Sequence, residues 1–167
     1  MTLPFNAQSS PKENVIAFDW DDTLFSPVHG YNVDAFRAIA ALTEQGEKVC
    51  IVTNRGQNAG DGMSHLQIAM GFMAAKLPSI PLEIFAKQTV KTDEFPYRIK
   101  LVVDNEDPRD PKNGYLPEGE NPVVIRVGQD FSFSSNEAFL ATVMTGLDVQ
   151  QIDSSPLPLP TLQPKDR

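Results

Sequence analysis

Apolar residues along this chain fall into short runs separated by helical patterns and turns. The runs predict strands, because a strand covered on both faces is apolar throughout rather than alternating with polar positions. Apolar side chains at helical spacing predict helices over residues 33–45 and 63–77, and a shorter helix lies within 89–97. A last helix is predicted from Ser135 to about Gly146. The predicted strands span residues 15–19, 48–53, 82–85, 99–103 and 123–127.

The predicted helix over residues 63–77 carries one apolar stripe made of Leu66, Met70, Met73 and Leu77. Stripes rich in methionine are more often part of a protein core than of a ligand site. We therefore expect this stripe to face the interior.

Strands that alternate with helices predict a parallel sheet with right-handed crossovers and helices on both faces. The fold class is thus α/β, a three-layer α/β/α Rossmann-like domain. The crossovers are too short to hold a separate inserted domain. Residues 15–148 form this domain, 1–14 are a lead-in, and 149–167 form a proline-rich tail that favours an extended conformation.

Three further segments are predicted to be loops, over residues 25–32, 54–62 and 105–122. The last is long for a compact domain, and such loops are often functional lids. The sequence leaves a lid and an inert excursion equally open.

Composition limits the class of protein. The chain has 167 residues, of which 41% are hydrophobic and 22% charged, as in a single globular domain. The net charge of −8 argues against broad binding to a nucleic-acid backbone, although one nucleic-acid end could still enter a local pocket. No apolar run reaches the roughly 18 residues of a membrane span, so no membrane partner is expected. The single Cys50 and the absence of a secretion signal predict a cytoplasmic protein.

Polar side chains follow three of the predicted strands. In a parallel sheet these strand ends share one edge, so their side chains converge on one crevice. Carboxylates that lie close together repel each other, and a bound divalent cation such as Mg²⁺ commonly offsets this repulsion. The residues are Asp19 and Asp21, Thr53 and Asn54, and Asp104 and Asn105.

These motifs resemble those of the haloacid dehalogenase superfamily of phosphatases. The string D-W-D-D-T at 19–23 matches the family's first motif, V-C-I-V-T ends at Thr53 as the second does, and L-V-V-D-N-E-D at 101–107 resembles the fourth. The resemblance implies a capless member, Mg²⁺ as cofactor and sheet order 5-4-1-2-3. It also implies that the backbone carbonyl of Asp21 binds the metal.

Each residue type has a chemical role in this interpretation. Asp19 is the nucleophile that accepts the phosphoryl group, and Asp21 is the general acid and base. Mg²⁺ bridges Asp19 and Asp104, with Asn105 or Asp107 as a further ligand. The phosphoryl oxygens are held by Thr53, with Asn54 and Arg55 as substrate-binding candidates.

The third motif of the family is a lysine, and two are available before the fourth strand. Lys91 is preferred over Lys87 because it opens the predicted short helix, where the family's lysine commonly lies. The string V-K-T-D-E-F at 90–95 is also similar to the phosphatase half of polynucleotide kinase-phosphatases, although no kinase-type phosphate-binding loop is present.

The sequence thus predicts a Mg²⁺-dependent phosphohydrolase that acts on a phosphate monoester. The phosphorylated substrate is a small molecule such as a nucleotide, or a polynucleotide 3′-end. Two alternatives remain, a catalytically silent binding protein with the same fold and a phosphotransferase to an acceptor other than water. The sequence leaves the oligomeric state open.

Overall fold

The computed structural model describes residues 12–55 and 63–133. Its centre is a five-stranded sheet in which every neighbouring pair is parallel, so the predicted α/β class is confirmed. The strands are β1 (Glu13–Asp19), β4 (Val49–Thr53), β5 (Glu83–Ala86), β6 (Tyr97–Asp104) and β7 (Val123–Arg126). They lie in the order β5-β4-β1-β6-β7.

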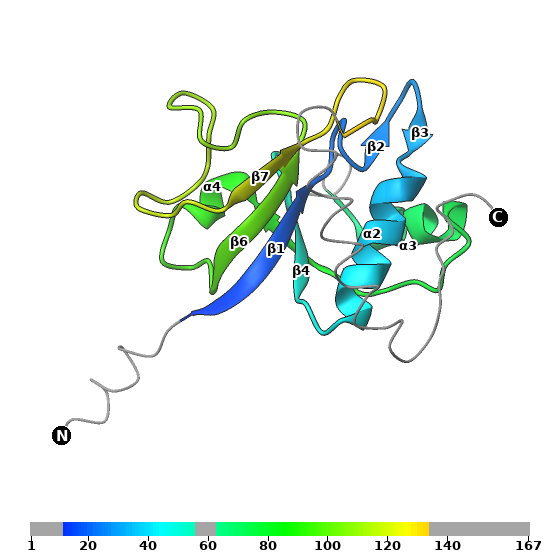
Figure 1. Cartoon of the computed structure of the whole chain (residues 1–167), viewed down its shortest axis with the longest axis horizontal. Coiled ribbons are helices and arrows are strands. Elements are labelled where there is room, and N and C mark those ends of the chain that lie inside the picture. Colours follow the sequence, from blue (N-terminus) through cyan, green and yellow to red (C-terminus); the bar gives the residue numbers. More distant parts are fainter. Residues whose placement is uncertain (1–11, 56–62, 134–167) are drawn as a thin grey trace.

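The position of β1 in the middle of the sheet decides where the candidate site forms. Numbered 1 to 5 along the chain, the strands of this sheet run 3-2-1-4-5 from one edge and 5-4-1-2-3 from the other. The strand β1 therefore lies between β4 and β6 (Figure 1). Its C-terminal residue Asp19 thus ends beside the C-terminal residues of both neighbours.

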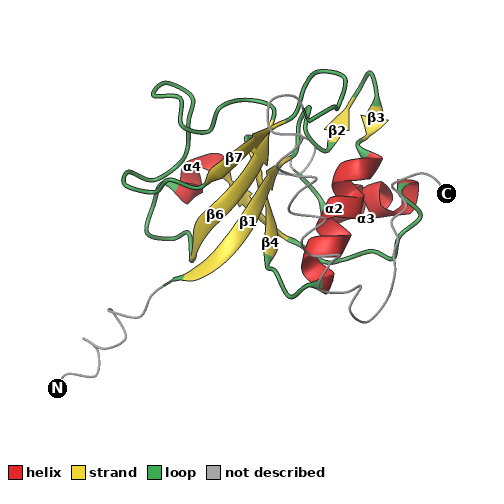
Figure 2. Cartoon of the chain, in the orientation of Figure 1, coloured by secondary structure: helices red, strands yellow, loops and turns green. Residues whose placement is uncertain are grey.

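In the part of the chain that the structure describes, one face of the sheet is covered by helices α2 (Val33–Glu44) and α3 (His65–Ala74) (Figure 2). Their apolar side chains pack on alternate residues of the strands, such as Ile16 and Phe18. The side chain of Asn32 caps α2, because it accepts a hydrogen bond from the backbone N–H of Ala35.

The opposite face is covered differently from the predicted helical layer. Among the described residues, its only helix is the single turn α4 (Lys87–Val90), and the segments before and after β6 add Phe95 and Tyr115 to this face. The predicted helix at residues 135–146, the proline-rich tail, residues 1–11 and residues 56–62 lie outside the described residues. Within the described residues, α4 is the part of the predicted second helical layer that is present.

The apolar stripe predicted for the core lies mostly on the outside of α3. The exposed fractions are 69% for Leu66, 44% for Met70 and 72% for Met73. Only Leu77, beyond the end of the helix, packs against the core. The predicted orientation of this helix was therefore wrong.

The face that α3 does bury is built around Gly71. A Cβ atom at this position would lie 2.0 Å from Cζ of Phe36 in α2, so only glycine fits there. The ring of Phe72 then meets Phe36 edge-on, with 5.0 Å between the ring centres. Close approach of the two helices at Gly71 outweighs the larger apolar side chains of the other stripe.

A small hairpin occupies the segment after β1 that was predicted to be a loop. Its strands are β2 (Phe25–Ser26) and β3 (Gly30–Tyr31). Both strands contact Trp20, which is fully buried and lies edge-on against Phe36. This aromatic cluster fixes the backbone that follows Asp19.

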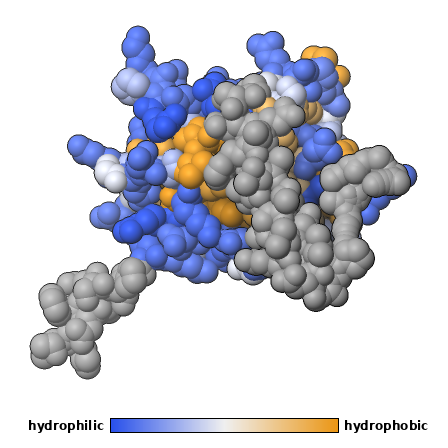
Figure 3. All heavy atoms as spheres, in the orientation of Figure 1, coloured by the Kyte–Doolittle hydropathy of each residue, from blue (hydrophilic) through white to orange (hydrophobic). Residues whose placement is uncertain are grey.

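The visible surface of the described residues is mostly hydrophilic, with an apolar patch beside the atoms drawn in grey (Figure 3). Within residues 12–55 and 63–133, no helix has the length and apolar character needed to cross a bilayer.

Candidate active site

Three strands bring their last residues together at the C-terminal edge of the sheet. Asp19 ends β1, Thr53 ends β4 and Asp104 ends β6, with exposed fractions of 3%, 0% and 0%. Two buried carboxylates at one edge carry a large desolvation cost unless a cation offsets it. The convergence predicted from the strand ends is therefore present for Asp19, Thr53 and Asp104.

Lys87 supplies that cation in the structure. Its Nζ lies 2.9 Å from Oδ1 of Asp19 and 3.3 Å from Oδ2 of Asp104. Burial disfavours the charged ammonium, but the two carboxylates outweigh it and raise the pKa of Lys87. Lys87 therefore remains protonated between them.

The position of α4 explains why Lys87 rather than Lys91 reaches the carboxylates. The helix starts at Lys87, directly after the last residue of β5, whereas the sequence predicted it further along. Lys91 is the C-cap of the helix and is exposed. Among the described residues it contacts neither Asp19 nor Asp104, so the preference for Lys91 as the lysine at this position was wrong.

The side-chain amide of Asn105 lies among three oxygen atoms. With its nitrogen turned toward them, it donates to Oδ2 of Asp19 at 2.9 Å, to the backbone oxygen of Asp21 at 3.2 Å and to Oδ1 of Asp104 at 3.1 Å. An amide nitrogen has only two hydrogens for these three acceptors. With the amide in the other orientation, four oxygens lie close together, and a cation between them would offset their repulsion.

This oxygen cluster fits Mg²⁺. Oxygens at about 2.1 Å from an octahedral Mg²⁺ lie roughly 3 Å from their neighbours. The three distances around the Asn105 amide match that spacing. The cluster combines carboxylate, carbonyl and amide oxygens, which are the ligand types that Mg²⁺ accepts.

The described part of the chain contains no group of three or more His, Cys, Asp or Glu side chains that could hold a metal. The candidate set is consistent with this, because only Asp19 and Asp104 contribute carboxylates to it. Asp107, the other predicted ligand, instead bonds the backbone and side chain of Arg109. Asn105 is therefore the better candidate.

Asp21 turns its side chain away from this cluster. Its carboxylate is 47% exposed and receives three hydrogen bonds from Arg55, the shortest 2.8 Å long. Thr53 Oγ1 accepts the backbone N–H of Arg55 at 3.0 Å and so shapes the loop that carries it. Arg55 thus holds Asp21 at the mouth of the site.

The surroundings of Asp19 disfavour the ionised form of its carboxyl group. Burial, together with the neighbouring Asp104, raises the pKa of Asp19 to about 8, although Lys87 and Thr23 act against the shift. The hydroxyl of Thr23 donates to Oδ2 of Asp19 at 2.9 Å. Oδ1 is left to Lys87, so each oxygen of Asp19 has a defined partner.

Tyr115 is the residue at the site that the sequence did not reveal. Its hydroxyl donates to Oδ2 of Asp104 at 2.6 Å, and its ring lies 4.8 Å from Nζ of Lys87. It belongs to the long loop between β6 and β7. Its signal in the sequence is weak, a single aromatic side chain in a segment rich in proline, glycine and charge.

The part of the loop that carries Tyr115 is tightly folded. The backbone N–H of Gly114 donates to the carbonyl of Asp110 at 2.7 Å, and that of Tyr115 donates to Pro108 at 3.0 Å. A Cβ atom at Gly114 would lie 2.4 Å from both carbonyl oxygens. The loop is therefore held against the site by its own turns as well as by the Tyr115 hydroxyl.

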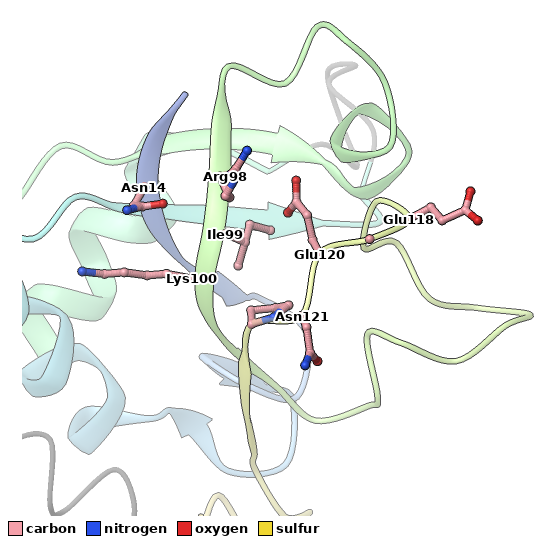
Figure 4. A pocket seen from close by; sticks show the side chains of 9 residues that line it. Asn14, Arg98, Ile99, Lys100, Glu118, Glu120 and Asn121 are labelled. Carbon is pink, nitrogen blue, oxygen red and sulfur yellow. The ribbon is translucent and has the colours of Figure 1, made fainter. Parts of the chain in front are cut away.

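Cavities lie at both ends of the sheet among the described residues. A cavity of about 220 Å³ is lined by Lys87 and Tyr115, which contact the carboxylates, and by residues that include Asn54, Gln88, Lys91 and Asn113. A larger one, of about 590 Å³, lies at the opposite end of β1 and β6, beside Asn14, Arg98 and Glu120 (Figure 4). The smaller cavity is therefore the one that belongs to the candidate site.

Comparison of the chain with family models, with curated proteins and with solved structures found no match. The resemblance to the haloacid dehalogenase superfamily therefore rests on the motifs alone.

Proposed function

We propose that this chain is a Mg²⁺-dependent phosphohydrolase of the haloacid dehalogenase type that forms a phosphoryl intermediate on Asp19. The observation that carries the proposal is the cluster at the end of β1, in which Asp19 lies 2.9 Å from the Lys87 ammonium beside the oxygens of Asp104 and Asn105. The motif order along the chain and the central position of β1 support it.

In the first step, an oxygen of Asp19 attacks phosphorus and the bond from phosphorus to the leaving oxygen breaks. Lys87 neutralises charge on the phosphoryl oxygens, and Thr53 with nearby backbone N–H groups holds them. Asp21, exposed at the mouth, donates a proton to the leaving oxygen.

In the second step, water attacks phosphorus and the bond to Asp19 breaks. Asp21, now a carboxylate, accepts the proton of that water, and inorganic phosphate leaves with Asp19 restored. For this proton exchange, the hydrogen bonds from Arg55 to the Asp21 carboxylate have to weaken. Alternatively, one of them remains and keeps the carboxylate oriented.

Mg²⁺ would be held by Asp19, Asp104, Asn105 and the backbone oxygen of Asp21. When bound, it supplies positive charge that screens the repulsion between the anionic nucleophile and the anionic substrate.

The test is release of phosphate from p-nitrophenyl phosphate, with Mg²⁺ and with EDTA, by the wild-type chain and by Asp19→Asn. We expect metal-dependent turnover that Asp19→Asn abolishes. A folded protein that releases no phosphate from any of a panel of esters would instead indicate a silent binding protein. Transfer of phosphate to added alcohols in preference to water would indicate a phosphotransferase.

The substrate panel includes nucleotides and oligonucleotides with 3′- and 5′-phosphates. The likeness of residues 90–95 to polynucleotide phosphatases predicts activity on a 3′-phosphorylated end. Preference for small esters over oligonucleotides would remove that part of the proposal.

A further inference from the structure

The cavity of about 220 Å³ beside the carboxylates has a composition that the hydrolytic step alone does not explain. It lies between α4 and the loop that carries Tyr115. Lys87 forms its inner side, next to Asp19, and Lys91 forms part of its outer side. The two lysines are four residues apart, so they lie on the same side of the turn, with Cβ atoms roughly 6 Å apart.

The two ammonium groups have different surroundings. That of Lys87 is engaged by Asp19 and Asp104, as described above. That of Lys91 makes no hydrogen bond or ion pair with any residue in 12–55 and 63–133. A cation that lines a cavity without a protein partner in this region is suited to bind an anion from solution.

The other described side chains of the cavity are hydrogen-bonding groups. Asn54, Gln88 and Asn113 present amides, and no described lining residue is a carboxylate. The single aromatic residue, Tyr115, already contacts Lys87 with its ring and Asp104 with its hydroxyl. The cavity therefore favours a hydroxylated or anionic group over an apolar chain or a stacked base.

We propose that this cavity binds a second phosphate of the substrate, with Lys91 as its main cationic contact. The inference rests on the proposed function, because it assumes that the first phosphate lies at Asp19 and Lys87. The spacing of the two lysines suits phosphates carried on one sugar. The substrate is then a small bisphosphorylated molecule, a sugar or nucleoside bisphosphate, rather than a simple monoester.

A polynucleotide end fits these observations less well. It would place further phosphodiesters outside the cavity, and the loop over residues 105–122, which helps to line the cavity, has more acidic than basic side chains. The net charge of the chain is −8, so the surrounding field repels an extended polyanion. One local phosphate beside Lys91 avoids that cost.

The experiment compares matched pairs of ligands that differ by one phosphate. The ligands are adenosine 3′,5′-bisphosphate with the 3′- and 5′-monophosphates, fructose 1,6-bisphosphate with the 1- and 6-monophosphates, and a 3′-phosphorylated oligonucleotide. Steady-state kinetics use the wild-type chain with Mg²⁺. Equilibrium binding is measured by calorimetry on Asp19→Asn, so that affinity is read without turnover.

Lys91→Met is the test variant and Lys91→Arg keeps the charge. Lys112→Met removes a lysine that belongs to the loop carrying Tyr115 but does not line the cavity. We expect at least one bisphosphate to have a KM and a dissociation constant about tenfold lower than its monophosphates, a typical effect of one charge-assisted contact. Lys91→Met should remove that advantage, whereas Lys91→Arg and Lys112→Met should retain it.

The two proposals fail in different ways. Turnover of monophosphates with no advantage for any bisphosphate, or an advantage that survives in Lys91→Met, would overturn the second-phosphate site and leave the phosphatase intact. Tight binding of a bisphosphate through Lys91 without any release of phosphate would keep the site and overturn the hydrolytic function. Preference for the oligonucleotide over every small bisphosphate would also overturn the inference.

Discussion

The hydroxyl of Tyr115 donates a 2.6 Å hydrogen bond to Oδ2 of Asp104. Since Oδ1 of Asp104 faces the Asn105 amide, this bond fixes the direction of a candidate metal ligand. The long loop between β6 and β7 thus contributes directly to the geometry of the site, which the sequence alone left open.

Tyr115→Phe removes this bond and keeps the ring beside Lys87. Loss of such a supporting contact commonly weakens metal affinity by 10–100-fold, and we expect a weakening of about tenfold for Mg²⁺. Titration of Mn²⁺ by electron paramagnetic resonance, with Mg²⁺ as competitor, measures this without substrate. The matched control is Tyr97→Phe, which loses a hydrogen bond to Glu83 at the other end of the sheet. Equal affinity in Tyr115→Phe and the wild type would show that Tyr115 does not orient Asp104.

Lys87→Met tests which lysine serves the carboxylates. It removes the cation from between Asp19 and Asp104, so we expect turnover of p-nitrophenyl phosphate to fall by about 10²–10³-fold, as with loss of other electrostatic stabilisers. Lys91→Met should reduce it far less, because its ammonium contacts neither carboxylate within the described residues. The reverse ranking would restore the choice that the sequence favoured. Circular dichroism of both variants checks that they fold.

The raised pKa of Asp19 predicts how stability depends on pH in the absence of metal. The folded state holds the Asp19 proton up to about pH 8, whereas the unfolded chain loses it near 3.8. The folded state thus binds more protons between these values, and the free energy of unfolding should decrease as pH rises through this window. Urea denaturation in EDTA at pH 5, 6.5 and 8 measures the trend.

Asp19→Asn provides the control for this trend, since it cannot titrate there. Its stability should change less with pH than that of the wild type. Mg²⁺ added to the wild type at pH 8 should restore stability, because it favours the charged carboxylate. Identical pH dependence in both proteins would mean that Asp19 does not carry the shifted titration.

The sequence predicted the strands well because each is a compact run of apolar residues bounded by polar ones. The end of each run also located Asp19, Thr53 and Asp104, since parallel strands share one edge. The prediction of the helix start failed for α4, because Lys87 follows β5 directly and no capping side chain marks the start of the helix. Because α4 is a single turn, placing its start four residues too late was enough to assign Lys91 instead of Lys87 to the site.

The prediction for helix α3 failed for a different reason. Its sequence carries two apolar stripes, and the stripe with the larger side chains is the one that does not face the core. The choice depends on how closely α2 can approach, which is a property of the pair of helices and not of either sequence. Tyr115 illustrates the same limit, because a loop residue is recruited to the site by the path of the chain and not by any local pattern.

Gly71→Ala tests the packing that decided the orientation of α3. Alanine normally stabilises a helix by about 1 kcal/mol relative to glycine. Here the added methyl would lie 2.0 Å from the Phe36 ring, so we expect a net loss of about 1–3 kcal/mol from overpacking. Denaturant titration measures it. The exposed Met73→Ala on the same helix should change stability by less than about 0.5 kcal/mol. A more stable Gly71→Ala would contradict this packing.

The pairing of Asp21 with Arg55 leads to a prediction about leaving groups. A general acid matters most when the departing oxygen is strongly basic, so Asp21→Asn should slow hydrolysis of an alkyl phosphate by about 10²–10⁴-fold and of p-nitrophenyl phosphate far less. Arg55→Lys keeps the positive charge but loses the two-point grip on the carboxylate. Arg55→Lys should show the same preference for the better leaving group in weaker form, because Asp21 is present but less well oriented.

The measurement is kcat/KM for a series of esters with leaving groups of graded basicity, compared among the wild type, Asp21→Asn and Arg55→Lys. Equal losses across the series in Asp21→Asn would assign Asp21 a structural role and require another proton donor.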